Sequence, residues 1–254
     1  MEDIRFNSEK DVDCFFRHLK SLGSGSEGIV YRKGIYAYKR YNELYKNLYS
    51  NEVSIYRLSR YRDIIIDNIY FIRALMYYDD MVVGSVSRFS GGVCCSKLNL
   101  HMCKLDKLIM GLSMLKNNVY ELSKLGICIE DNFLGNILYF DGSFRLIDTG
   151  GYYYYTDIPG IDSYDIDFVY RKNMRKVVHK LFLCITNYMG IEDNFIYRFL
   201  LDTDSIYKDY MKDTDLMVDP DNTILGIKSE LEEYIGYEID SFSTCRKELV
   251  KLKK

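Results

Sequence analysis

Hydrophobic positions follow two different patterns along the chain, and the change falls near residue 90. Before it, short β-prone runs alternate with helical stripes at residues 8–20 and 43–60. The β-prone runs form two pairs separated by turn residues, which is typical of β-hairpins. The pairs are residues 28–31 with 35–39 and residues 71–77 with 81–86. This part of the chain is therefore predicted to form a small antiparallel sheet, with a short leading helix and one long helix.

The rest of the chain has a mostly helical pattern. A strong amphipathic stripe over residues 104–125 predicts a long helix, and Gly126 is placed to end it. Residues 136–148 form one more hairpin signal, with Asp141-Gly142 at the turn. From about residue 164 onward the hydrophobic spacing is again helical.

These patterns predict an α+β fold with two lobes. Residues 1–89 would form a small antiparallel β-sheet lobe with one helix, and residues 90–254 a larger helical lobe. Ser90-Gly91-Gly92 is the best candidate for a hinge between them.

Charge and composition exclude several classes of protein. The net charge of −3 gives no sign of a general binder of nucleic acid or anionic membranes. The apolar runs are too short to span a bilayer, and the N-terminus is acidic rather than signal-like. Seven cysteines without a Cys-x-x-Cys pair and three scattered histidines argue against a disulfide framework or a structural zinc site. We expect a soluble, cytoplasmic protein.

The first candidate for chemistry is a glycine-rich loop just before a predicted strand. It reads Gly23-Ser24-Gly25-Ser26-Glu27-Gly28 and is followed by Val30. Without side chains at the glycines, backbone amides can approach phosphate oxygens closely. The alternative for this loop on its own is an ordinary glycine-rich turn that opens a hairpin.

Lys39 lies in the middle of a predicted strand among residues that otherwise look half-buried. A buried ammonium group is costly unless it is paired, and Glu52 on the following helix is the expected partner. Together they could hold the α- and β-phosphates of ATP. The alternative is a surface lysine whose ammonium group reaches the solvent.

Three polar residues in the second half could supply the remaining parts of a phosphotransfer site. Asp131 and Asn136 lie five residues apart in a predicted loop, and Asp148 ends the strand that follows. Asp131 would accept a hydrogen bond from an acceptor hydroxyl, whereas Asn136 and Asp148 would bind Mg²⁺. Each acid alone could simply cap a loop, but the set together with the upstream loop and lysine favours phosphoryl transfer.

The order and spacing of these motifs resemble the protein-kinase superfamily over roughly residues 20–150. Gly23-x-Gly25-x-x-Gly28 resembles the glycine-rich loop, and Ala37-Tyr38-Lys39 the Val-Ala-Ile-Lys strand. Glu52 resembles the glutamate that pairs with this lysine. Asp131-x-x-x-x-Asn136 resembles the catalytic loop, and Asp148-Thr149-Gly150 the Asp-Phe-Gly motif. The resemblance implies a two-lobed kinase-like fold with ATP and Mg²⁺ as cofactors.

The chain also departs from the kinase pattern. Ile129-Glu130 stands where kinases have His-Arg, Phe133 where Ser/Thr kinases usually carry a lysine, and Thr149 where the motif has Phe. No Ala-Pro-Glu is found. The loop is also similar to that of aminoglycoside- and choline-kinase-type phosphotransferases. The resemblance therefore implies a Ser/Thr-type protein kinase acting on a protein substrate, with a small-molecule phosphotransferase or a nucleotide-binding pseudokinase scaffold as alternatives.

Two further features follow the candidate metal residue. The tyrosines at 152–155 stand where a kinase has its activation segment, so they are either autophosphorylation sites or, as we favour, aromatic packing residues. Asp165 or Asp167, at the start of a helical stretch, is a candidate for bracing the catalytic loop.

Overall fold

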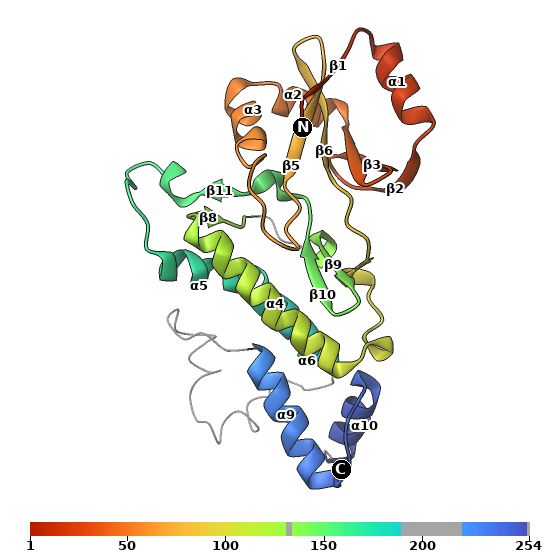
Figure 1. Cartoon of the computed structure of the whole chain (residues 1–254), viewed down its shortest axis with the longest axis vertical. Coiled ribbons are helices and arrows are strands. Elements are labelled where there is room, and N and C mark those ends of the chain that lie inside the picture. The colour runs from red at the N-terminus through yellow and green to blue at the C-terminus, as the bar shows by residue number, and fades with distance from the viewer. Residues whose placement is uncertain (131–133, 189–219, 253–254) are drawn as a thin grey trace. The chain divides into compact units, whose positions relative to one another are not determined.

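The computed structural model describes residues 1–130, 134–188 and 220–252 of the chain. These residues belong to two compact units (Figure 1). The first unit comprises Met1–Gly91 together with Leu146–Tyr153, and the second comprises Gly92–Arg145 together with Tyr154–Lys254. The predicted α+β class is confirmed, because the chain forms a mainly antiparallel sheet and several helices. The assignment of Leu146–Tyr153 to the first unit was not predicted.

A six-stranded sheet forms the centre of the first unit, with the strand order β1-β5-β6-β4-β3-β2. The strands are β1 (Ile4–Phe6), β2 (Lys20–Ser24), β3 (Gly28–Lys33), β4 (Tyr36–Tyr41), β5 (Ile72–Tyr78) and β6 (Met81–Arg88). Both predicted hairpins are present, as β3–β4 and β5–β6. All pairs are antiparallel except β1 with β5, which is parallel.

Alternating side chains give this sheet two apolar faces, because successive residues of a strand point to opposite sides. Ala74 and Met76 of β5 pack with α1 (Glu9–Arg17) on one face. Their neighbours Leu75 and Tyr77 pack on the other face with Leu58 of α3 (Glu52–Ser59). Both faces of the central strands are therefore buried, which explains why β5 is hydrophobic almost throughout.

The helical stripe over residues 43–60 is two helices rather than the single long one predicted. α2 (Glu43–Tyr49) ends at Ser50, and α3 begins directly after Asn51. The side chain of Asn51 accepts a hydrogen bond from the backbone amide of Ser54 at 2.9 Å. Such an N-cap stabilises a new helix start, so the polar pair Ser50-Asn51 interrupts the stripe.

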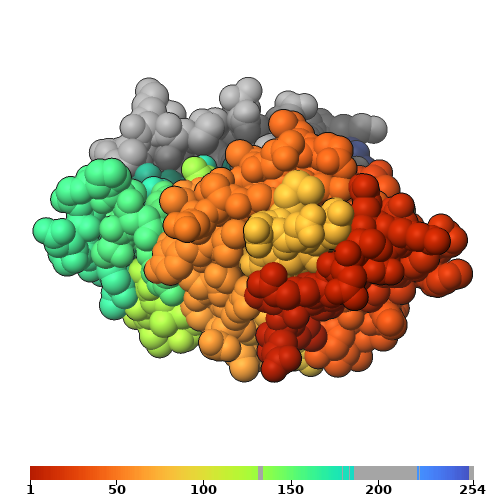
Figure 2. All heavy atoms as spheres, turned by 90° about the horizontal axis from the view of Figure 1, so that it is seen from above, coloured from red at the N-terminus to blue at the C-terminus, as the bar shows by residue number. Residues whose placement is uncertain are grey.

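The edge strand β1 was not predicted because it is only three residues long. Asp3, just before it, accepts a hydrogen bond from the backbone amide of Leu75 at 2.8 Å and forms an ion pair with Arg62 at 2.9 Å. These contacts hold the N-terminal segment beside β5. Figure 2 shows this segment, in red, lying against the yellow residues of the β5–β6 hairpin.

The second unit is built around α4 (Leu105–Lys124). Its predicted hydrophobic stripe is buried, with Leu105, Leu108, Leu112, Leu115, Val119 and Leu122 all inaccessible to solvent. The other described helices are α5 (Ile166–Lys176), α6 (Val178–Tyr188), α9 (Pro220–Ile235) and α10 (Phe242–Leu252). The short strands are β7 (Val93–Cys94), β8 (Ile127–Cys128), β9 (Ile137–Phe140), β10 (Ser143–Leu146) and β11 (Tyr153–Tyr154). None of the helices in the described part of the chain is both long and apolar enough to cross a membrane.

Glycines lie where this unit requires them. Gly126 has a φ of 70° and follows the last turn of α4, as predicted for a helix-ending glycine. Asp141 and Gly142 both have positive φ, 44° and 84°, which is the geometry of a tight hairpin turn between β9 and β10. Within α4, a Cβ at Gly111 would lie 3.0 Å from the ring of Phe144, so this helix and the hairpin approach closely.

Candidate functional site

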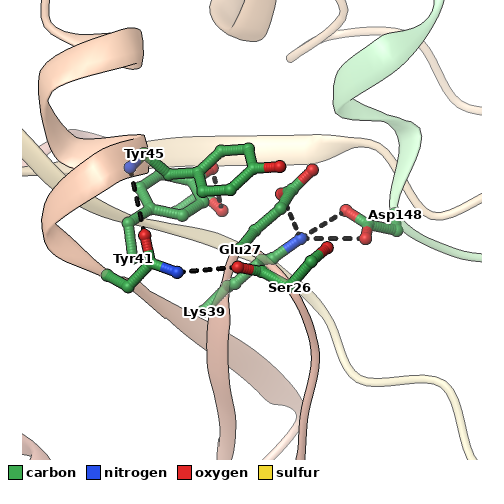
Figure 3. Close-up of polar contacts among 8 residues, drawn as sticks. Ser26, Glu27, Lys39, Tyr41, Tyr45 and Asp148 are labelled. Atoms are coloured by element: carbon green, nitrogen blue, oxygen red, sulfur yellow. Dashed lines mark hydrogen bonds and ion pairs between the residues drawn. The ribbon is translucent and has the colours of Figure 1, made fainter.

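Lys39 is the centre of a charged cluster in the first unit. It lies in β4, opposite Val30 of β3 and Ser85 of β6, with 15% of its side chain exposed. Its Nζ donates to Oε2 of Glu27 at 2.5 Å and to both carboxylate oxygens of Asp148 at 2.8 Å (Figure 3). An ammonium group has three N–H donors, so these contacts use all of them.

The two carboxylates determine the charge state of this lysine. Burial by itself lowers the pKa of Lys39, but the negative charges and hydrogen bonds of Asp148 and Glu27 outweigh it and leave the pKa above its usual value. Lys39 is therefore a protonated, largely buried cation at neutral pH. The sequence predicts a paired lysine at this position, and in the structure two acids, Glu27 and Asp148, lie beside it.

Asp148 comes to Lys39 from a segment 109 residues further along the chain. Two backbone hydrogen bonds hold Leu146, two residues before Asp148. Its amide donates to the carbonyl of Asn68, and its carbonyl accepts from the amide of Tyr70. The following Thr149 is buried. Asp148 itself has a left-handed backbone, with φ 57° and ψ 55°. Non-glycine residues in this conformation occur often at functional sites, where the surrounding structure holds them.

The predicted pair of Lys39 with Glu52 is wrong. Glu52 is exposed in the first turn of α3, and the acidic partners of Lys39 among the described residues are Glu27 and Asp148. The physical reason is the break between α2 and α3, since a helix that starts anew at Asn51 places Glu52 at its exposed end. Glu27 was missed as a partner. One sequence feature could have identified it: Glu27 lies at the tip of the hairpin that faces the half-buried lysine.

The glycine-rich segment is a β-hairpin whose tip is the predicted loop. Gly23 and Ser24 end β2, Gly25 and Ser26 form the exposed turn, and Gly28 and Val30 lie in β3. The amide of Gly25 donates to the carbonyl of Gly28 at 2.9 Å and closes the turn. A Cβ added at Gly23 or Gly25 would meet nothing within 4 Å, so packing within the described chain does not demand glycine at these two positions.

Gly28, by contrast, is required by packing. A Cβ there would lie 1.9 Å from the carbonyl oxygen of Arg40 in β4. We expect Gly28→Ala to destabilise the first unit by about 2 kcal/mol or more, because the backbone of β4 must move. Urea unfolding followed by circular dichroism measures this, with Gly25→Ala as the matched control expected to change stability by less than about 0.5 kcal/mol. Equal stability of the two variants would contradict the close approach.

Hydrogen bonds of Asn42 connect the loop to the start of α2. Its amide donates to the carbonyl of Glu27 at 2.9 Å, and its side-chain nitrogen donates to the carbonyl of Ser26 at 2.7 Å. Its side-chain oxygen accepts from the amide of Tyr45 at 3.1 Å and so caps α2 (Figure 3). One residue thus fixes the loop backbone and the helix start together.

The predicted residues of the second unit are only partly described. Asp131 lies outside the described residues. Asn136 ends a short 3₁₀ turn, Leu134–Asn136, directly before β9, and is half-buried. The thiol of Cys94 donates to the carbonyls of Leu134 and Gly135, each at 3.4 Å, and holds this turn beside β7.

A buried asparagine braces the chain just before the predicted catalytic loop. Asn173 of α5 is fully buried, and its side-chain oxygen accepts from the amide of Ile129 at 2.8 Å. Its side-chain nitrogen donates to the carbonyl of Ile127 at 2.8 Å and to the hydroxyl of Ser123 at 2.9 Å. The expectation that Asp165 or Asp167 braces the catalytic loop concerns residues 131–133, which lie outside the described part of the chain, so it stays a prediction. Asp165 is an exposed N-cap of α5 whose carboxylate accepts from the amide of Asp167.

Of the four tyrosines at 152–155, one is buried in the core and three are partly exposed. Tyr152 is buried and packs edge-on against Phe71, with ring centroids 6.2 Å apart. Burial, reinforced by the charge of Asp148, raises the pKa of the Tyr152 hydroxyl. This residue has the packing role that we favoured, whereas the three tyrosines after it are half-buried.

Among the described residues, no group of three or more His, Cys, Asp and Glu side chains is arranged to hold a metal ion. Mg²⁺ in nucleotide sites usually needs only one or two carboxylates, because phosphates and water supply its other ligands. The one carboxylate of Asp148 fits that type of ligation. Comparison with known proteins adds no relative: a scan against models of protein families finds no match, and a search of curated proteins finds none either.

Proposed function

We propose that the chain is an ATP-dependent phosphotransferase that moves the γ-phosphoryl group of Mg·ATP to a hydroxyl, as a protein kinase of the Ser/Thr type does. The observation that carries the proposal is the contact between Lys39 and both oxygens of Asp148 at 2.8 Å. A phosphate-binding cation and a metal-binding carboxylate must lie side by side to act on one triphosphate. Residues 109 positions apart are brought together here.

The glycine loop supports the same function. Two of its glycines have open space around them, and the hairpin tip is fixed to β4 and α2 through Asn42. Exposed backbone amides on such a tip suit phosphate oxygens. In this proposal the loop residues at 23–28 cover the phosphates beside Val30, and Lys39 binds them through its ammonium group.

Asp148 and Asn136 are the proposed metal ligands, and Asp131 is proposed to orient the acceptor hydroxyl. The roles of Asn136 and Asp131 rest on the sequence motif. When bound, Mg²⁺ neutralises part of the negative charge that builds up on the transferring phosphoryl group. The chain's own residues position the triphosphate and the hydroxyl, which is most of what phosphoryl transfer requires from a protein.

A binding titration tests the nucleotide site. Lys39→Met is expected to weaken the binding of Mg·ATP by about tenfold or more, because it removes a charge-assisted contact to phosphate. Lys33→Met, at an exposed lysine on the neighbouring strand, is the matched control and is expected to bind like wild type. Equal affinity of the Lys39 variant and wild type in isothermal titration calorimetry would contradict the proposal.

A further inference from the structure

The closest partner of Lys39 is the glutamate at the tip of the glycine loop. The Glu27 carboxylate lies 2.5 Å from Nζ, compared with 2.8 Å for Asp148, and is the less exposed of the two, at 27% against 37%. A charge-assisted contact of this length between half-buried groups is stronger than a surface ion pair. The loop therefore places a negative charge beside the lysine, in addition to the backbone amides that it offers to phosphate.

Hydrogen bonds from Asn42 hold the backbone of the loop at Glu27. Its backbone carbonyl accepts from the amide of Asn42 at 2.9 Å. Burial raises the pKa of the Tyr49 hydroxyl at the end of α2, and the negative charge of Glu27 raises it further. The side-chain nitrogen of Asn42 also donates to the carbonyl of the preceding Ser26 at 2.7 Å, so the position of the Glu27 backbone does not depend on the lysine alone.

The three donors of Lys39 are all used, so a phosphate oxygen can bind only where a carboxylate gives way. Asp148 takes two of the donors and is the more exposed partner. In the proposed function Asp148 would bind Mg²⁺, and these two donors of Lys39 would then be available to phosphate. Glu27 keeps the third donor, because hydrogen bonds from Asn42 fix the loop backbone at Ser26 and Glu27.

We propose that Glu27 is the residue that positions the Lys39 ammonium group for nucleotide phosphate, the role that the sequence motif assigned to Glu52. This inference rests on the proposed function. It makes the counter-ion of the lysine part of the glycine loop, so ordering of the loop and orientation of the lysine are a single event. Glu27 is a positioning residue, since it acts through Lys39.

The first test measures the reactivity of Lys39 without any nucleotide. Glu27→Gln is expected to lower the pKa of Lys39 and so raise its rate of acylation by acetic anhydride roughly tenfold, read by mass spectrometry. Glu52→Gln and the matched control Glu9→Gln, an exposed glutamate in the first turn of α1, are expected to label like wild type. Unchanged labelling of the Glu27 variant, or an equal rise in the Glu52 variant, overturns the inference.

The second test uses Mg·ATP and the full chain. Glu27→Gln is expected to lower kcat/KM for ATP by about 100-fold, with partial recovery in Glu27→Asp, because misplacing a phosphate-binding group by about 1 Å costs that much. Loss of turnover in Glu52→Gln but not in Glu27→Gln would overturn the inference while leaving the proposed function intact. A wild-type protein that neither binds nor turns over Mg·ATP would overturn the proposed function itself, whatever the labelling shows.

Discussion

Asp148→Asn is expected to lower Mg·ATP-dependent turnover by about 10³-fold or more and to leave the fold intact. Asparagine has nearly the same shape as aspartate and tolerates the left-handed backbone that position 148 adopts, with φ 57°. The substitution removes the negative charge and replaces one of the two oxygens that accept from Lys39 by an NH2 group. That charge is the proposed ligand for Mg²⁺, and it is one of the two that hold Lys39 protonated.

A second aspartate provides a matched control for this experiment. Asp79 also has a positive φ, 50°, and is exposed in the turn between β5 and β6 of the same unit. Asp79→Asn is therefore expected to match wild type in both turnover and melting temperature. If the Asp148 variant kept turnover within a few-fold of wild type, Asp148 would not be the metal ligand, and the central assignment of the site would be wrong.

Asn173→Ala is expected to destabilise the second unit by about 3 kcal/mol or more. The change removes three hydrogen bonds and leaves the amide of Ile129, the carbonyl of Ile127 and the hydroxyl of Ser123 without the Asn173 partner. Asn173 and Ser123 are fully buried, and a buried polar group that loses its hydrogen bond costs free energy. Urea unfolding monitored by circular dichroism measures the loss.

Asn117→Ala is the control for this substitution. Asn117 is an exposed residue of α4, so its replacement is expected to change stability by less than about 0.5 kcal/mol. Because Asn173 fixes the backbone up to Ile129, its loss is also expected to reduce turnover more than the loss of stability explains. A variant of Asn173 with the stability of wild type would show that the brace contributes little.

Patterns that depend on local backbone chemistry were predictable from the sequence. Gly126 ends α4 and Asp141-Gly142 forms the β9–β10 turn, because positive φ restricts these positions to few residue types. The stripe along α4 was predictable for a similar reason, since a buried helix face repeats every three to four residues. The α+β class follows from such local signals taken together.

The motifs placed Lys39 and Asp148 in one site, but other features that depend on contacts between distant segments were not predictable. The partner of Lys39 was expected on a helix, yet the break at Ser50-Asn51 exposes Glu52 and leaves the contact to Glu27. The three residues of β1 carry too little pattern to mark a strand, and Asp3 holds them through contacts more than 50 residues away. Asn173 looks like any polar residue of an amphipathic helix until its three partners are known.

The measurement that tests the central claim most directly is transfer of ³²P from γ-labelled ATP in the presence of Mg²⁺, with wild type beside Asp148→Asn. The reactions contain the chain alone, generic protein substrates, or a panel of small alcohols and aminoglycosides. We predict label on protein with wild type and none with the variant. Label on a small molecule would assign the chain to small-molecule phosphotransfer on the same site. Absence of label in every reaction, with Mg·ATP bound, would contradict the claim and favour a nucleotide-binding scaffold.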